Sequence, residues 1–173
     1  MGIRPAKCYR AIERPYTRVS QRKPRKSYVK GVPASKINKF ELGKKGDYKL
    51  RLNLISEHSV QIRHNALEAI RMATNKVLEK HIGPDMYYFK LFPYPHHVLR
   101  ENPLATGAGA DRFSTGMRQS FGKPIATAAQ VKRGQILLSV WCTPDKAAIA
   151  KKALIVSSKK IPTTSRITVE HLA

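Results

Sequence analysis

Hydrophobic and polar residues alternate over positions 48–54, where every second residue is tyrosine or leucine and the residues between them are polar. This two-residue period is typical of a strand with one buried face. A shorter strand is expected at 60–63, and the aromatic-rich run at 86–92 predicts another strand, which ends at Pro93 and Pro95. The first half of the chain therefore contributes several strands to a sheet.

Between the second and third of these strands, the period changes to that of a helix. Hydrophobic residues recur at steps of three and four from Leu67 to Leu78, and charged and amide side chains occupy the opposite side. Asn65 and Glu68 have the spacing of a capping box, and Gly83 followed by proline supplies a stop. The pattern predicts one amphipathic helix.

The second half of the chain repeats this mixture of strands and a helix. Two apolar runs, 124–131 and 135–142, are separated by Lys-Arg-Gly, and this spacing predicts a β-hairpin. Thr-Pro-Asp at 143–145 is a typical helix start, and a final strand is expected at 165–170. Two helices with five or six strands predict the α+β class, as a two-layer domain with both helices on a mixed sheet.

The composition supports one folded domain and indicates a polyanionic partner. The chain has 173 residues, of which 42% are hydrophobic, and this is enough to build a core. Its 33 Lys and Arg residues exceed its 11 Asp and Glu residues, so the formal net charge is +22. Such an excess repels itself unless a polyanion neutralises it, which argues against an ordinary cytosolic enzyme.

Cysteine usage and hydropathy exclude further classes. Cys8 and Cys142 lie far apart and form no paired motif, which argues against a disulfide-rich secreted scaffold and against a zinc ribbon. Both are expected to be reduced thiols. The first 30 residues lack the apolar stretch of a signal peptide, and the longest apolar run, 136–142, is far shorter than the ~20 residues of a membrane helix. A soluble intracellular protein without a membrane partner is expected.

Residues 1–34 are predicted to form a basic, extended arm. The first 30 residues carry ten basic residues, one acidic residue and three prolines, a composition that cannot bury enough apolar surface to fold alone. Tyrosines among the cations suit stacking on unpaired bases, and a solvated basic tail is the alternative. The candidate RNA-binding residues of the arm are Arg4, Lys7, Tyr9, Arg10, Arg14, Tyr16, Arg18, Arg22, Lys23, Arg25, Lys26, Tyr28 and Lys30.

A glycine-rich segment, 101–123, is inserted in the predicted domain 35–173. Without periodicity, it exceeds the ~12 to 15 residues beyond which loops are usually functional or disordered. Arg112 stands where a dinucleotide fingerprint needs glycine, and Pro124 stands where a Walker A loop needs Ser or Thr. Close approach to RNA phosphates is expected, and a mobile loop without a partner is the alternative. The candidate contact residues are Gly107, Gly109, Asp111, Arg112, Gly116, Arg118 and Lys123.

The remaining residues do not form a pattern typical of catalysis. His96 and His97 are adjacent in an extended segment, so they make a poor chelate, and phosphate or packing contacts are expected from them. Arg100 is a further candidate RNA contact. The acids are scattered, with no cluster to hold the metals of a nuclease, and no metal or cofactor is expected. Trp141 lies in an apolar run and is expected in the core.

Five segments carry a resemblance to a known family. They are RPAKCYR (4–10), SKINKFELGKK (35–45), RHNALEAIRMATNK (63–76), PHHVLREN (95–102) and AGADRFSTGMRQSFGKP (108–124). These segments resemble the universal large-subunit ribosomal protein sixteen, formerly called ten-e in archaea and eukaryotes. The likeness covers nearly the whole chain. The chain lacks the glycine-lysine run of bacterial members and the C-terminal extension of eukaryotic ones, so an archaeal source fits best.

The resemblance implies an α/β-hammerhead fold that packs among rRNA helices near the peptidyl-transferase centre. The arm would then bind large-subunit rRNA, and the loop 101–123 would face tRNA. The expected protein is a structural constituent of the cytoplasmic ribosome with neighbouring ribosomal proteins as partners, and it is neither an enzyme nor a homo-oligomer. The alternatives from other classes are a metal-dependent nuclease, an RNA-modifying enzyme and a DNA-compacting architectural protein.

Overall fold

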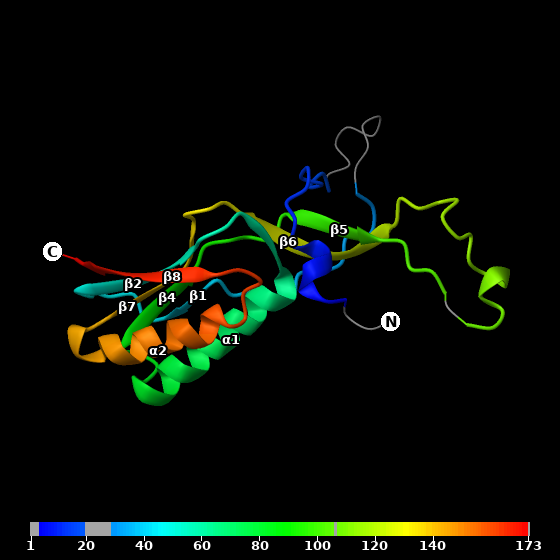
Figure 1. Ribbon diagram of the computed structural model, residues 1–173. Coiled ribbons are helices and arrows are strands. Elements are labelled where there is room, and N and C mark those ends of the chain that lie inside the picture. Colours follow the sequence, from blue (N-terminus) through cyan, green and yellow to red (C-terminus); the bar gives the residue numbers. More distant parts are fainter. Residues whose placement is uncertain (1–3, 20–28, 106, 173) are drawn as a thin grey trace.

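The computed structural model describes residues 4–19, 29–105 and 107–172, and it divides the strands between two antiparallel sheets (Figure 1). The larger sheet has the order β1-β4-β7-β2-β8. Its strands are β1 (Glu41–Gly43), β4 (Tyr87–Leu91), β7 (Ile136–Cys142), β2 (Leu50–Ser56) and β8 (Ser165–His171). The smaller sheet has the order β3-β6-β5. Its strands are β3 (Val60–Arg63), β6 (Lys123–Val131) and β5 (His97–Glu101).

Two helices, α1 (His64–His81) and α2 (Ala147–Ser158), lie together on one face of the five-stranded sheet (Figure 1). Alternate residues of the central strands, such as Leu54 in β2 and Phe89 in β4, are fully buried and pack with both helices in one core. Burial of this apolar surface is the main stabilising contribution. A buried hydrogen bond of 2.6 Å between the hydroxyls of Thr74 and Ser157 also joins the helices.

The three-stranded sheet extends beyond the helix layer, toward the side where the N-terminal chain and the long loop lie (Figure 1). Its middle strand, β6, pairs with β3 on one side and with β5 on the other. Between β5 and β6 the chain leaves the sheet as the loop 102–122. This sheet therefore positions the predicted arm and loop, while the five-stranded sheet and its helices hold most of the core.

The α+β class and the two helices predicted from the sequence are confirmed. The strands expected at 48–54, 60–63, 86–92 and 165–170 are present as β2, β3, β4 and β8. The sequence pattern does not predict β1 or β5. All strand pairs among the described residues are antiparallel, so the single mixed sheet is replaced by two antiparallel sheets.

The predicted hairpin of 124–131 and 135–142 is wrong, because the two strands belong to different sheets. β6 pairs with β3 and β5, whereas β7 pairs with β2 and β4. The intervening turn is bonded to the end of β2 instead. Gly134 N donates to Ser56 O at 2.8 Å, and Ser56 N donates to Gln135 O at 3.0 Å. The chain therefore passes from one sheet to the other at this turn.

Two local expectations are also wrong. The capping box does not form, because Asn65 Oδ1 accepts a hydrogen bond from the Ala66 amide and Glu68 binds Arg71. Trp141 is only part-buried, since its position in β7 places it on the sheet face that points away from the helices. Because apolar residues of β7 lie on both faces of the sheet, hydrophobicity alone does not show which of them face the helices.

The two cysteines lie apart in the structure, and neither forms a disulfide. Cys8 is exposed in the arm, whereas Cys142 is buried at the end of β7. Burial raises the pKa of the Cys142 thiol to about 11, so this side chain acts as a packing group at neutral pH. None of the described helices combines the length and the apolar character needed to span a bilayer.

Candidate nucleic-acid interface

The described part of the arm, residues 4–19, runs along the three-stranded sheet. Backbone hydrogen bonds tie it to two strands: Gln61 N in β3 donates to Arg10 O at 3.0 Å, and Val98 N in β5 donates to Tyr16 O at 2.9 Å. These bonds use the main chain, which every residue supplies whatever its side chain. The arm is therefore docked in part through its backbone, and exposed side chains such as Lys7, Arg10 and Arg14 remain available to a partner.

Glu101 joins the arm to the start of the loop. Its carboxylate pairs with Arg4 and accepts a hydrogen bond of 2.8 Å from Tyr9 Oη, while the Arg63 guanidinium lies 5.3 Å from the centre of the Tyr9 ring. The hydrogen bonds from Tyr9 and Arg4 lower the pKa of Glu101. Burial and the same carboxylate raise the pKa of Tyr9 to about 12. Glu101 is thus ionised and Tyr9 protonated at neutral pH, as this bond requires.

Arg100, the neighbouring residue in β5, lies between two aromatic rings. Its guanidinium carbon is 4.4 Å from the centre of the Tyr16 ring in the arm and 4.0 Å from the centre of the Phe121 ring near the end of the loop. Each ring face attracts the cation through its quadrupole. Arg100 thus connects the arm, β5 and the returning end of the loop, so the two candidate regions form one continuous surface.

A cavity of about 480 Å³ opens beside Arg100 and the two aromatic rings that flank it. Its lining includes Tyr16, Arg100 and Phe121 together with Lys30 and Lys123. Both lysines are exposed. The volume is within the usual range of ligand pockets, and a lining of aromatic rings and cations suits a nucleotide with its phosphate.

The loop projects from the end of the three-stranded sheet, away from the helices (Figure 1). A short 3-10 turn, Ala110–Arg112, is the regular element of its described part. The side chain of Asn102 donates to Gly116 O at 3.3 Å, which joins the outgoing and returning segments. Phe113 and Met117 are 78% and 71% exposed. The loop adds little to the core, so its shape serves contacts outside the chain.

Phe113 and Met117 are site residues that the sequence interpretation missed. Large apolar side chains in a segment without helix or strand period have no core to enter, and this signal is readable from the sequence. They add an apolar contact surface to the cations of the loop.

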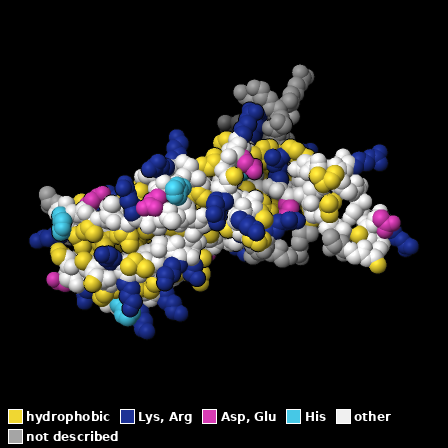
Figure 2. Space-filling model, viewed as in Figure 1, with side chains coloured by type: hydrophobic (Ala, Val, Ile, Leu, Met, Phe, Trp, Pro, Cys, Tyr) yellow, Lys and Arg dark blue, Asp and Glu magenta, His cyan; other side chains and the backbone are white. Residues whose placement is uncertain are grey.

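Most of the predicted cations lie on the outside of this surface. Among the described residues, the exposed ones are Arg4, Lys7, Arg10, Arg14, Lys30, Arg112, Arg118 and Lys123. Figure 2 shows many Lys and Arg side chains across the visible face and few acidic ones. The predicted residues Arg22, Lys23, Arg25, Lys26 and Tyr28 lie outside the described part of the chain. Val29 N donates to Arg18 O at 2.6 Å, so the residues that flank this segment are adjacent.

His96 and His97 point to opposite sides of their extended segment. His96 is exposed, with its ring 4.5 Å from that of Tyr94. His97 is 3% exposed, and its Nδ1 accepts a hydrogen bond of 2.9 Å from Tyr16 N. Phosphate or packing contacts are the two roles expected for this pair. His97 has the packing role, because its buried imidazole holds the arm on the sheet.

Acidification should destabilise the fold through two buried histidines. Burial lowers the pKa of both His97 and His64 below the ordinary value of 6.5, so the unfolded chain takes up protons first as the pH falls. Their stabilising contribution is therefore present above pH 6.5 and is lost as the pH falls through the lower, folded pKa. We expect a lower urea midpoint at about pH 5 than at about pH 7.

His97→Gln should reduce this pH dependence, with His64→Gln removing a further part. Glu101 and Glu41 also have lowered pKa values, but their contributions are lost only below the ordinary carboxyl value of 4.5. Identical urea midpoints at the two pH values would show that the histidines do not couple to folding.

No three His, Cys, Asp or Glu side chains converge on a possible metal site within residues 4–19, 29–105 and 107–172. The polar groups gathered at the interface include arginines, lysines, tyrosines and the Glu101 carboxylate, which is already ionised and paired. Side chains of these kinds are suited to contacts with phosphates and bases.

Comparisons with known proteins agree with this chemistry. The family model described as ribosomal protein L16p/L10e matches residues 16–168. The chain is 44% identical to the large ribosomal subunit protein uL16 of Archaeoglobus fulgidus, over 98% of this chain and 94% of that protein. It is 46% identical to uL16 of Staphylothermus marinus, over 99% and 96% of the two chains. For uL16 of Methanococcus maripaludis the identity is 45%, over 98% and 95%.

Proposed function

The chain belongs to the L16p/L10e family of ribosomal proteins and is a structural constituent of the large ribosomal subunit, and from this premise we propose that its arm and three-stranded sheet bind rRNA. We further propose that the loop 101–123 contacts tRNA. The hammerhead description belongs to the same proposal, with the three-stranded sheet as the part that projects from the helix-covered sheet toward the RNA.

The observation that carries the rRNA proposal is the way in which the arm is held. Its backbone is bonded to β3 and β5, and the exposed side chains of Lys7, Arg10 and Arg14 form no ion pair with a carboxylate among the described residues. A docked backbone has already lost part of its conformational entropy, so cations placed in this way bind phosphates at a lower ordering cost. Release of the phosphate counterions then drives binding.

The loop suits a contact that forms and breaks. It projects beyond the sheet, its tip carries Arg112, and Phe113 and Met117 expose apolar surface beside that cation. A loop with little core packing changes conformation without disturbing the domain. These features support a contact with tRNA, which passes through the ribosome, more than a permanent one with rRNA.

The enzymatic alternatives are set aside by the family. Relatives that match almost the whole chain are named as ribosomal subunit proteins, and the chain is accordingly a ribosomal protein rather than a nuclease or an RNA-modifying enzyme. DNA compaction is the remaining alternative for a basic protein, and it is tested by comparing the affinity for duplex DNA with the affinity for rRNA.

The rRNA proposal predicts the salt dependence of binding. In the full-length chain, Lys7→Gln with Arg10→Gln and Arg14→Gln removes three candidate phosphate contacts. The slope of log K against log salt on large-subunit rRNA should become shallower by about 2 to 3, since each phosphate contact contributes about 0.7 to 0.9. Filter binding over a series of salt concentrations measures this slope.

The matched control removes three exposed lysines from the helix layer, as Lys76→Gln with Lys80→Gln and Lys151→Gln. Both variants lose the same net charge, so a general electrostatic effect would change both slopes equally. Equal slopes for the two variants would count against the arm as the contact, and binding of duplex DNA as tight as that of rRNA would support the DNA alternative.

A further inference from the structure

The face of the five-stranded sheet that points away from α1 and α2 carries a row of four neighbouring side chains. In register across β8, β2, β7 and β4, these are Glu170, Arg51, Trp141 and Tyr88. Residues directly opposite each other in antiparallel strands project on the same side of the sheet, so the four form one surface. We call this surface the open face, because each of the four side chains keeps some solvent exposure.

Two aromatic rings lie at the centre of the open face, with cations around them. The rings of Tyr88 and Trp141 are 4.9 Å apart and inclined by 38°. The Arg51 guanidinium lies 5.1 Å from the centre of the Trp141 ring, and Lys45 Nζ lies 5.6 Å from that of Tyr88. Exposed sheet faces usually carry polar residues, so a tryptophan, a tyrosine and two cations in contact form an unusual surface.

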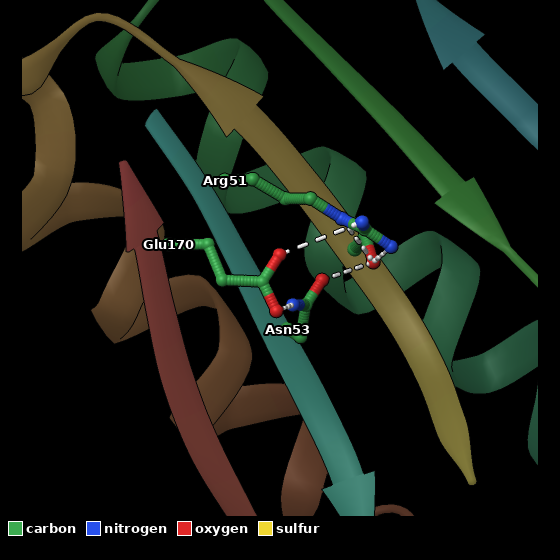
Figure 3. A network of polar contacts seen from close by, with 4 residues as sticks. Arg51, Asn53 and Glu170 are labelled. Atoms are coloured by element: carbon green, nitrogen blue, oxygen red, sulfur yellow. Dashed lines mark hydrogen bonds and ion pairs between the residues drawn. The ribbon is translucent and has the colours of Figure 1, made fainter. Parts of the chain in front are cut away.

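A hydrogen-bond network fixes the position of Arg51 (Figure 3). Arg51 Nη2 donates to Ser139 Oγ at 3.3 Å, and Arg51 Nη1 lies 3.5 Å from Glu170 Oε2. Asn53 Nδ2 donates to the other Glu170 oxygen at 2.7 Å, and Asn53 and Ser139 are fully buried beneath the charged side chains. The guanidinium is therefore held beside the indole before any partner arrives, which reduces the entropy cost of binding.

Positive charge remains in surplus next to the aromatic pair. Lys45 and Lys90 both pair with the Glu41 carboxylate, at 2.9 Å and 2.6 Å, so one negative charge faces two ammonium groups. Lys45 is 72% exposed. Glu170 in turn compensates Arg51. A partner that brings negative charge to Lys45 and a flat π surface to Trp141 is complementary to this arrangement.

We propose that the open face is a second RNA contact, in which an unpaired base stacks on Trp141 and Tyr88 while its phosphate meets Lys45. The inference rests on the proposed rRNA-binding function and assigns it a surface separate from the arm and the loop. A single-stranded nucleotide supplies both the π face and the negative charge, whereas a paired base in a duplex is not available for stacking. An acidic protein segment supplies only the charge.

Trp141 is itself the probe for this contact, because it is the single tryptophan of the chain. The full-length protein is titrated at low salt with oligoadenylate, with an RNA duplex, and with inorganic polyphosphate as a polyanion without bases. Stacking of a base on the indole quenches its emission. We expect saturable quenching with oligoadenylate and little change with the duplex or with polyphosphate, although all three bind a cationic protein.

Variants test whether the quenching comes from a stabilising contact. Trp141→Leu should weaken the binding of labelled oligoadenylate about tenfold, measured by fluorescence anisotropy, because stacking on one aromatic side chain contributes about that factor. Lys45→Gln should weaken it less and should shift the quenching curve to higher RNA concentration. Lys151→Gln, on the helix layer, is the matched control and should leave both unchanged.

Each outcome separates this inference from the proposed function. Tight binding of rRNA with no change in Trp141 emission would overturn the second contact and leave the arm as the binding site. Equal quenching by polyphosphate would also overturn it, since charge alone would then account for the signal. Quenching by an acidic peptide that oligoadenylate fails to displace would identify a protein-binding face instead. If Trp141→Leu does not fold, Trp141→Phe retains a ring and should show binding between wild type and Lys45→Gln.

Discussion

Deletion of residues 108–116 should leave the thermal midpoint of the domain nearly unchanged and should lower tRNA-dependent translation about a hundredfold. The deleted segment makes few bonds to the rest of the chain, and Phe113, which it contains, is 78% exposed. Loss of a positioning contact for a substrate commonly costs about this factor in rate. Large subunits reconstituted with the variant, assayed in poly(U)-directed synthesis, measure the loss.

The control for this deletion keeps the length of the loop. Replacement of Arg112, Phe113 and Met117 by serine preserves the connection but removes the cation and the apolar surface, so it should reproduce most of the defect. A deletion that lowers the thermal midpoint by many degrees would show that the loop supports the fold. Normal translation by subunits that contain the shortened protein would contradict a tRNA contact.

The elements that the sequence predicts correctly are those whose burial is decided locally. The alternation over 48–54 identifies β2 because Leu50, Leu52 and Leu54 lie in the core that this inner strand forms with the helices. The same alternation places Asn53 in solvent, yet Asn53 is fully buried. Its side chain bonds to Glu170, which is 117 residues away in the chain, so a local period cannot predict its burial.

Strand pairing is the part that the sequence does not determine locally. Lys132, Arg133 and Gly134 do form a turn, and Gly134 has a φ of 80° as a turn glycine allows. The flanking strands nevertheless pair elsewhere, because β6 completes the sheet of β3 and β5 while β7 completes that of β2 and β4. A turn signal indicates that the chain reverses, but the choice of partner depends on distant strands.

At the candidate interface, the sequence likewise predicts which residue types are present but not which residues they contact. Composition identifies the basic arm and the glycine-rich loop. It does not reveal that Tyr9 and Tyr16 lie against Arg63 and Arg100 of the domain itself. An arginine near a tyrosine in sequence suggests stacking on RNA, whereas these arginines are more than 50 residues away from the tyrosines they contact. The arm and loop are therefore one unit, and a perturbation at their junction should affect both.

Gly122→Ala should destabilise that junction by about 3 kcal/mol. Gly122 has a φ of 81°, and a Cβ placed there would lie 2.8 Å from the carbonyl carbon of Glu101 and 3.0 Å from Asn102 N. Alanine therefore has to adopt a left-handed conformation and displace the main chain of the outgoing segment. Urea denaturation measures the global loss.

Displacement of Glu101 should also release the arm, since Arg4 and Tyr9 both bind its carboxylate and Arg100 precedes it. Trypsin cleavage after Arg10 should become faster in Gly122→Ala at temperatures where the core remains folded. Gly116→Ala is the matched control, because Gly116 also has a positive φ, 58°, but has no atom within 4 Å of the added methyl group. It should cost about 1 kcal/mol and leave arm cleavage unchanged, because conformational strain is then the only penalty. Equal destabilisation and equal cleavage of the two variants would mean that Gly122 is needed only for its φ, and that the loop junction does not hold the arm.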